Sequence, residues 1–146
     1  MDILDDMQGE VVALDTAPLI YFIEKHATYH PLLRPFFVGL ANEQYTAVTS
    51  TITLVEALVH PMRLKQTKLA EQYRKILLNS PHITTYDLSP EIAQIAAQIR
   101  ADYAIRTPDA IQLATAVYAN ATFFLTNDHA LRKYPHLKVL VVNDLS

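Results

Sequence analysis

The chain has 146 residues, of which 51% are hydrophobic and 18% charged, so its composition fits one folded domain and excludes a disordered protein. Its net charge of −3 gives no sign of a strongly basic nucleic-acid-binding surface, although an acidic protein can still bind phosphates through bridging metal ions. The absence of cysteine excludes disulfides, thiolate metal sites and cysteine catalysis. No apolar run of about 18 residues predicts a membrane span, the acidic start does not resemble a signal peptide, and the lack of cysteine fits a reducing compartment, so we expect a cytoplasmic protein.

The first half of the chain alternates between short apolar runs and amphipathic segments. Residues 11–14 form a continuous apolar run, typical of a strand buried on both faces, and residues 46–50 predict a second strand. We expect a helix that starts near Ala17, has Pro18 in its first turn and runs through about Glu24. Further helices are expected over 31–41 with the first turns distorted by Pro35, over 51–60 with an end near Pro61, and over 65–79.

The second half of the chain continues this alternation. Short strands are predicted over 82–88, 122–126 and 138–142. Between them we expect one helix capped by Ser89 and another capped by Thr107, the latter apolar nearly all round and therefore central. Strands that alternate with helices favour an α/β domain, with a parallel sheet and helices on both faces.

Four acidic residues occupy informative places in this pattern. Asp15 directly follows an apolar strand, and Asp128 follows another after Asn127. Asp109 opens the buried helix, and Glu56 lies about two turns into the helix after the second strand. Each has an ordinary structural explanation when it is taken alone. Asp15 and Asp128 can cap helices, Asp109 can complement a helix dipole, and Glu56 can be an exposed surface acid.

Taken together, the four acids favour a metal site. Ligands of parallel sheets bind beyond the carboxyl ends of the strands, where Asp15 and Asp128 are expected to lie. Carboxylates that converge there repel one another, and a hard divalent cation with a preference for oxygen ligands relieves the repulsion. We therefore expect Mg²⁺ or Mn²⁺ at this edge of the sheet.

Four segments carry a resemblance to a known family. The segments LDTAPLIYF, TSTITLVEAL, RTPDAIQLATA and FLTNDHALRK resemble the motifs of PIN-domain ribonucleases, and they are most similar to VapC-type toxins of bacterial toxin–antitoxin pairs. The resemblance covers nearly the whole chain and keeps the order and approximate spacing of the four acids. It implies a three-layer α/β/α fold with a small parallel sheet, and a single PIN-like nuclease domain over residues 1–146.

The resemblance also implies an activity, which is Mg²⁺- or Mn²⁺-dependent cleavage of RNA by a metal-activated water, with 5′-phosphate and 3′-hydroxyl products. The family's acidic quartet, which would bind the metal and catalyse cleavage, corresponds to Asp15, Glu56, Asp109 and Asp128.

Three polar residues accompany the quartet in this comparison. Thr126 and Asn127 fill the family's TND triplet, and Thr126 or Thr16 would order water molecules around the metal. Ordinary strand-end or turn hydroxyls remain the alternative for both threonines.

The implied partners are an RNA substrate, a small antitoxin protein and a second copy of the chain in a homodimer. Arg106, Arg132 and Lys133 flank the acidic motifs and are candidates for contacts with RNA phosphates, although a solvated surface explains Arg132 and Lys133 equally well. Two other functions stay open: a solitary RNA-processing nuclease, and a degenerate PIN domain that acts as a binding module. The presence of all four acids speaks against the second.

Overall fold

The computed structural model describes residues 2–146, and its centre is a five-stranded parallel sheet in the order β3-β2-β1-β4-β5. Each strand lies within a segment that the sequence predicts to be a strand, so the expected parallel α/β architecture is confirmed. The strands are β1 (Val11–Leu14), β2 (Thr46–Ser50), β3 (Ile83–Tyr86), β4 (Phe123–Thr126) and β5 (Lys138–Val141).

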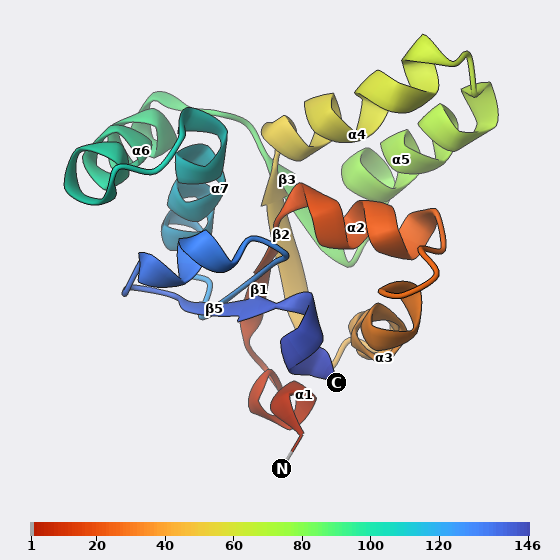
Figure 1. Ribbon diagram of the computed structural model, residues 1–146, viewed down its shortest axis with the longest axis horizontal. Helices are drawn as coiled ribbons and strands as arrows, with labels where there is room; N and C mark the ends of the chain where they lie inside the picture. The colour runs from red at the N-terminus through yellow and green to blue at the C-terminus, as the bar shows by residue number, and fades with distance from the viewer. Residues whose placement is uncertain (1) are drawn as a thin grey trace.

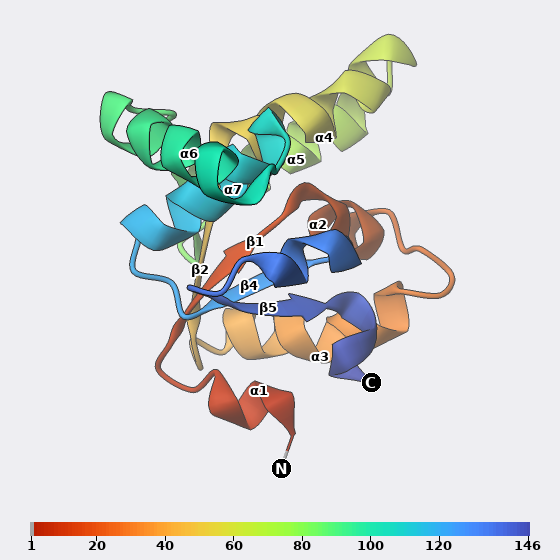
Figure 2. The same cartoon turned by 60° about the vertical axis from the view of Figure 1, so that its left-hand side comes forward.

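Helices flank the sheet on both sides, which confirms the three-layer arrangement (Figure 1). One side carries α6 (Pro90–Tyr103) and α7 (Thr107–Tyr118), and the other carries α2 (Thr16–Ile23) and α3 (His30–Ala41). Figure 2 shows the strands between α7 above and α3 below. The remaining helices are α1 (Ile3–Asp6), the paired α4 (Thr51–Arg63) and α5 (Thr67–Asn79), and the short η1 (His129–Lys133) and η2 (Val142–Leu145).

The central strands are buried on both faces because each contributes alternate side chains to two separate cores. In β1, Val12 and Leu14 pack into the core under α2 and α3, whereas Ala13 packs into the core under α6 and α7. In β4, Phe124 packs into the core under α6 and α7 and is fully buried, while its neighbours Phe123 and Leu125 pack into the opposite core. This packing explains why the two strands read as continuous apolar runs.

Several helix ends differ from the expectation by a few residues, and two of them are informative. Helix α4 runs through Pro61 and ends at Arg63. Proline cannot donate the backbone hydrogen bond of that turn, and the burial of its ring offsets this cost. Helix α7 begins one residue earlier than expected: Thr107 is its first helical residue, and Arg106 occupies the cap position without a side-chain capping bond. Ser89, by contrast, caps α6 as predicted, because its hydroxyl accepts the Ile92 N–H at 3.2 Å.

One edge of the sheet gathers the segments that follow β1, β2 and β4. Strand β1 lies between β2 and β4, and its pairing with β4 continues past Leu14, since the Asp15 N–H donates to the Leu125 carbonyl at 2.9 Å. Helices α2 and α4 begin at the same edge. No helix within residues 2–146 is both long and apolar enough to cross a membrane.

Candidate active site

Asp15 lies at the junction of β1 and α2, where both of its carboxylate oxygens are engaged. It occupies the N-cap position with extended backbone angles, and its Oδ1 accepts the Thr16 N–H at 2.8 Å. Its Oδ2 accepts a hydrogen bond of 2.7 Å from the hydroxyl of Thr126 at the end of β4. The capping explanation is therefore confirmed, and it fixes the orientation of the carboxylate rather than competing with a role in a site.

Burial and neighbouring charge act together on Asp15. Burial raises the pKa of this carboxyl above its ordinary value, and the hydrogen bonds from Thr126 and the Thr16 N–H oppose that rise. The negative charges of Asp109 and Glu56 raise the pKa further, which means that both acids lie close enough to act on Asp15. Negative charge from three carboxylates therefore acts together at this place in the fold.

Glu56 is held at the site by a single side-chain contact. Its side chain lies on the exposed face of α4, as the explanation of Glu56 as a surface acid requires. Nevertheless, the hydroxyl of Thr16, the first residue of α2, donates a hydrogen bond of 2.6 Å to Glu56 Oε1. Thr16 thus connects the helix that Asp15 caps to the helix that carries Glu56.

Asp109 forms an ion pair with the residue that precedes α7. The Arg106 guanidinium donates to its Oδ2 from Nη2 at 3.1 Å and from Nε at 3.3 Å. The Arg106 side chain is 80% exposed and that of Asp109 only 15%. Asp109 also lies in the first turn of its helix, so the helix-dipole explanation holds alongside a role in the site.

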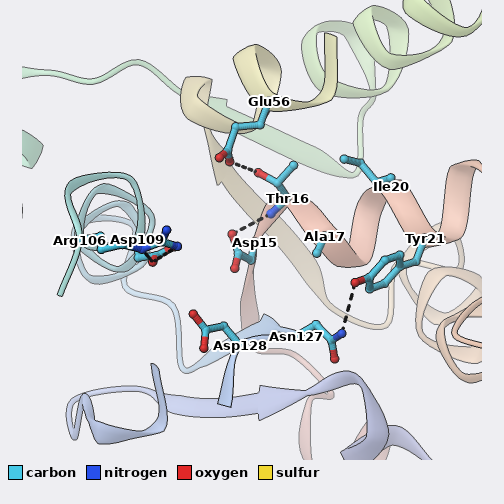
Figure 3. Close-up of a pocket in the computed structure, with 10 residues that line it drawn as sticks. All are labelled: Asp15, Thr16, Ala17, Ile20, Tyr21, Glu56, Arg106, Asp109, Asn127 and Asp128. Carbon is cyan, nitrogen blue, oxygen red and sulfur yellow. Dashed lines mark hydrogen bonds and ion pairs between the residues drawn. The ribbon is translucent and has the colours of Figure 1, made fainter. Parts of the chain in front are cut away.

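Asp128 caps η1, as its place before a short turn predicts. Its Oδ1 accepts the Ala130 N–H at 2.9 Å, and its own N–H donates to the Thr126 hydroxyl oxygen at 3.1 Å. Within the described residues, only Oδ1 of Asp128 accepts a hydrogen bond from the backbone. Figure 3 shows the Asp128 side chain directed toward the space beside Asp15.

The four carboxylates converge on one cavity of about 410 Å³, here called the acidic pocket. In Figure 3 they approach this space from four separate segments of the chain. The residues that line the pocket are Asp15, Thr16, Ala17, Ile20, Tyr21, Glu56, Arg106, Asp109, Asn127 and Asp128.

The chemistry of this pocket fits a hard divalent cation. Its acidic lining offers only oxygen donors and no imidazole, as Mg²⁺ and Mn²⁺ prefer. Within residues 2–146, however, no three His, Cys, Asp or Glu side chains lie close enough to hold one ion directly. Mg²⁺ commonly binds one or two carboxylates and completes its coordination shell with water and substrate phosphates. A pocket in which fewer than three acids can contact one ion directly is therefore compatible with Mg²⁺.

The other polar residues expected at the site have different surroundings. Asn127 lines the pocket, and its amide donates to the Tyr21 hydroxyl at 3.3 Å. Lys133 lines a smaller adjoining cavity of about 100 Å³ that Asp109 and Asp128 also line. Arg132 instead donates to Asp144 at 2.7 Å and does not line the acidic pocket.

Two contributors behind and beside the pocket were not anticipated from the sequence. Tyr21 lines the pocket from the second turn of α2, where it reads as an ordinary amphipathic-helix aromatic. Gln112 is 2% exposed in α7, and its amide donates to Thr53 at 2.7 Å. A single carboxamide inside an otherwise apolar helix is the signal that points to Gln112, since buried amides require hydrogen-bond partners.

Comparison with known families gives one match. The sequence model of the PIN domain matches residues 12–137, a range that includes all four acidic residues. No curated protein matches the chain.

Several solved structures share the fold. VapC20 of Mycobacterium tuberculosis, described as a sarcin–ricin loop cleaving toxin, has a TM-score of 0.71 at 14% identity, over 88% of this chain and 98% of that one. A chain of VapBC2 from Rickettsia felis, bound to a promoter DNA fragment, has a TM-score of 0.69 at 20% identity, over 90% and 98%. A chain of a toxin–antitoxin complex from Klebsiella pneumoniae has a TM-score of 0.67 at 23% identity, over 90% and 97%. At such identities the likeness establishes the fold alone.

Proposed function

The chain belongs to the PIN domain family, and on that premise we propose that it is a metal-dependent endoribonuclease that acts as the toxin of a toxin–antitoxin pair. The observation that carries the proposal is the convergence of four carboxylates, from four segments of the chain, on the acidic pocket. PIN-domain nucleases generally use divalent metals, and one structural neighbour is described as a toxin that cleaves the sarcin–ricin loop.

The metal would be Mg²⁺ or Mn²⁺. When bound, such an ion supplies an acidified water and offsets negative charge on the phosphodiester. Its ligands would come from the four acids of the pocket, Asp15, Glu56, Asp109 and Asp128. One or two of these carboxylates would bind an ion directly, and the others would act through its bound water.

The chain's own residues would contribute orientation and charge. The two hydrogen bonds to Asp15 and the Thr16 bond to Glu56 fix these carboxylates before any substrate arrives. In the reaction, water would add to phosphorus and its proton would pass to a carboxylate of the pocket. The bond between phosphorus and the 3′-oxygen would break, and that oxygen would take up a proton from solvent, which yields 5′-phosphate and 3′-hydroxyl ends. Arg106 and Lys133 lie beside the carboxylates and would contact RNA phosphates.

The partner would be a small antitoxin. Structural neighbours are described as VapBC and toxin–antitoxin complexes, which supports a similar pairing for this chain. Arg106 is the only cationic side chain among the residues that line the acidic pocket, against four acids. An antitoxin that inserts a further basic side chain would offset part of the remaining negative charge and block the pocket. We expect the toxin to act as a homodimer in the cytoplasm.

Cleavage of RNA by the purified protein tests the enzymatic part of this proposal. We expect cleavage with Mg²⁺ or Mn²⁺, loss of cleavage in EDTA, and recovery when metal is restored. Asp109→Asn should lose cleavage, whereas Asp102→Asn should retain it, because Asp102 is an exposed acid of α6 outside the pocket. Undiminished cleavage by stripped enzyme in excess EDTA would contradict the metal mechanism.

Expression in cells tests the toxin part separately. We expect growth arrest by the wild-type protein, no arrest by Asp109→Asn, and relief by co-expression of a small antitoxin encoded beside the toxin. Harmless overexpression of demonstrably active enzyme, purified without a companion, would instead favour a solitary RNA-processing nuclease.

A further inference from the structure

A buried hydrogen-bond network lies directly behind the acidic pocket. Its centre is the Gln112 side-chain amide, whose Nε2 donates to Thr53 Oγ1 at 2.7 Å and to Thr16 Oγ1 at 3.4 Å. Gln112 is 2% exposed and Thr53 is 0% exposed, so solvent does not compete for these bonds. The two N–H groups of one carboxamide therefore serve two different hydroxyls.

Each hydroxyl has a single proton, which fixes the direction of the bonds that follow. Thr16 Oγ1 lies 2.6 Å from Glu56 Oε1 and 3.2 Å from Thr53 Oγ1, and the shorter contact with a carboxylate takes its proton. Thr49 donates its proton to the Leu14 carbonyl at 2.8 Å, so Thr53 must donate across the 2.8 Å contact with Thr49. One branch thus ends at Glu56, and the other ends at the residue before Asp15.

The orientation of the Gln112 amide follows from the same count. With the amide reversed, its oxygen would face Thr16, whose proton is committed to Glu56, and Nε2 would lose both acceptors. In the observed orientation Oε1 is buried without a hydrogen-bond partner in the described chain. An apolar side chain of the same length would fill this part of the core without an unpaired oxygen, so core packing alone does not explain a glutamine here.

We infer that Gln112 is a positioning residue of the acidic pocket: its amide orders the hydroxyls of Thr16 and Thr53, so that Thr16 presents its proton to Glu56. The other branch ties the end of β1, next to Asp15, to the same amide. Gln112 touches neither substrate nor metal in this role and acts only through the residues that it orients. The inference rests on the proposed function, because it assigns Gln112 to the metal-dependent reaction of that pocket.

Gln112→Met tests the inference because it removes both N–H donors and the unpaired oxygen while it keeps the length of the side chain. We expect the variant to melt no lower than wild type, yet to bind Mn²⁺ about 10–100-fold more weakly, the usual effect of losing a residue that orients a metal ligand. At saturating Mn²⁺ we expect kcat for RNA to fall with little change in KM, since a group that supports catalysis is misplaced.

Thr115→Val is the matched control. Thr115 is 1% exposed in the same helix, and its hydroxyl donates only to the Ile111 carbonyl at 2.8 Å. The control should leave Mn²⁺ affinity and kcat unchanged, whatever its effect on stability. Equal losses of Mn²⁺ affinity in Thr115→Val and Gln112→Met would overturn the inference, because they would show a general effect of disturbing α7.

A double-mutant cycle on Mn²⁺ affinity, measured by titration calorimetry, tests whether Gln112 acts through Glu56. In a Glu56→Gln background, Gln112→Met should weaken binding much less than in wild type. The same loss in both backgrounds would overturn the inference.

A second pair of variants serves if Gln112→Met does not fold. Thr16→Val breaks the same branch, and Thr16→Ser, which keeps the hydroxyl, should bind Mn²⁺ more tightly than Thr16→Val. Equal Mn²⁺ affinities of these two variants would also overturn the inference.

These outcomes separate the inference from the proposed function. Wild-type protein that neither binds Mn²⁺ nor cleaves RNA would contradict both. Wild-type protein that does both, alongside an unchanged Gln112→Met, would overturn only the role of Gln112.

Discussion

The hydroxyl of Thr126 donates a hydrogen bond of 2.7 Å to Asp15, and its oxygen also accepts the Asp128 N–H at 3.1 Å. Thr126 is completely buried at the end of β4, beside the end of β1. A single hydroxyl therefore links two of the four acids that line the pocket, and it sets the orientation of the more buried one.

Thr126→Val should destabilise the metal-free protein and reduce RNA cleavage. The substitution keeps the shape of the side chain but removes a hydrogen bond to a charged group, which is worth about 1.5–3 kcal/mol. Urea unfolding of both proteins in EDTA measures the difference. Thr122→Val is the control, because that exposed hydroxyl donates to Glu10 at 2.6 Å outside the pocket and should matter little.

The cost of Thr126→Val should depend on pH. Burial raises the pKa of Asp15 in the folded protein, so this carboxyl stabilises the fold below its unfolded pKa and loses that contribution as pH rises through the folded pKa. The Thr126 bond favours the charged form and limits the loss, so the valine variant should fall behind wild type as pH rises. A difference in unfolding free energy that is constant from acidic to neutral pH would show that the bond to Asp15 is not responsible.

Asp109→Asn should respond less to Mn²⁺ than wild type does. Without metal, the substitution relieves repulsion with Asp15 but gives up an ion pair with exposed Arg106, worth about 0–1 kcal/mol, and a helix-dipole contribution of about 0.3–1 kcal/mol. We therefore expect melting temperatures close to wild type in EDTA. Mn²⁺ at about a hundred times its dissociation constant should stabilise wild type by roughly 2.7 kcal/mol, and the variant by less. Equal shifts would exclude Asp109 from the metal site.

Lys133→Gln should weaken RNA binding more than Arg132→Gln does. Lys133 lines the cavity beside Asp109 and Asp128, whereas the Arg132 guanidinium is engaged with Asp144 at 2.7 Å. Loss of one phosphate contact should reduce the slope of log affinity against log salt by about 1, measured by RNA titration at several salt concentrations with catalytically inactive protein. A reduced slope for Arg132→Gln alone would reverse this assignment.

Arg132→Gln should instead have a small, pH-dependent effect on stability. Burial alone would raise the pKa of Asp144, but hydrogen bonds from Arg132 and the Val141 N–H, together with the Arg132 charge, hold it below its usual value. The charged carboxyl therefore stabilises the fold above its unfolded pKa, and this contribution disappears as pH falls through the folded pKa. Because the pair is about one-third exposed or more, we expect less than about 1 kcal/mol at neutral pH, measured by urea unfolding.

Gly39→Ala should destabilise the protein although it improves helix propensity by about 1 kcal/mol. A Cβ on Gly39 would overlap the Tyr45 hydroxyl and lie 2.9 Å from Tyr45 Cζ. Tyr45 is 2% exposed and donates to the Phe36 carbonyl, so it cannot move aside without losing that bond. We expect a net loss of about 1–3 kcal/mol in thermal or urea unfolding, with no selective loss of Mn²⁺ affinity. Stabilisation by the alanine would show that Tyr45 repacks freely.

The sequence alone determined the order of strands and helices, because local periodicity records which side chains each segment buries. Continuous apolar runs at β1 and β4 predict strands covered on both faces, and acids directly after them predict a charged edge of a parallel sheet. The predicted helix ends were less accurate at Pro61 and Thr107. Burial of Pro61 in α4 offsets its local preference to end a helix, which the sequence pattern does not show. The family resemblance agreed with these local patterns and named the same four acids.

Tertiary structure decided which of these residues meet, because contacts between distant segments depend on packing that no local pattern encodes. The pairing of β1 with β4 brings Thr126 to Asp15, and the approach of α2 to α4 brings Thr16 to Glu56. The same packing engages Arg132 with Asp144 and leaves Lys133 beside the acids. The sequence shows Gln112 as the one carboxamide of a mostly apolar helix. Only the three-dimensional arrangement gives its two N–H groups their acceptors behind the acidic pocket.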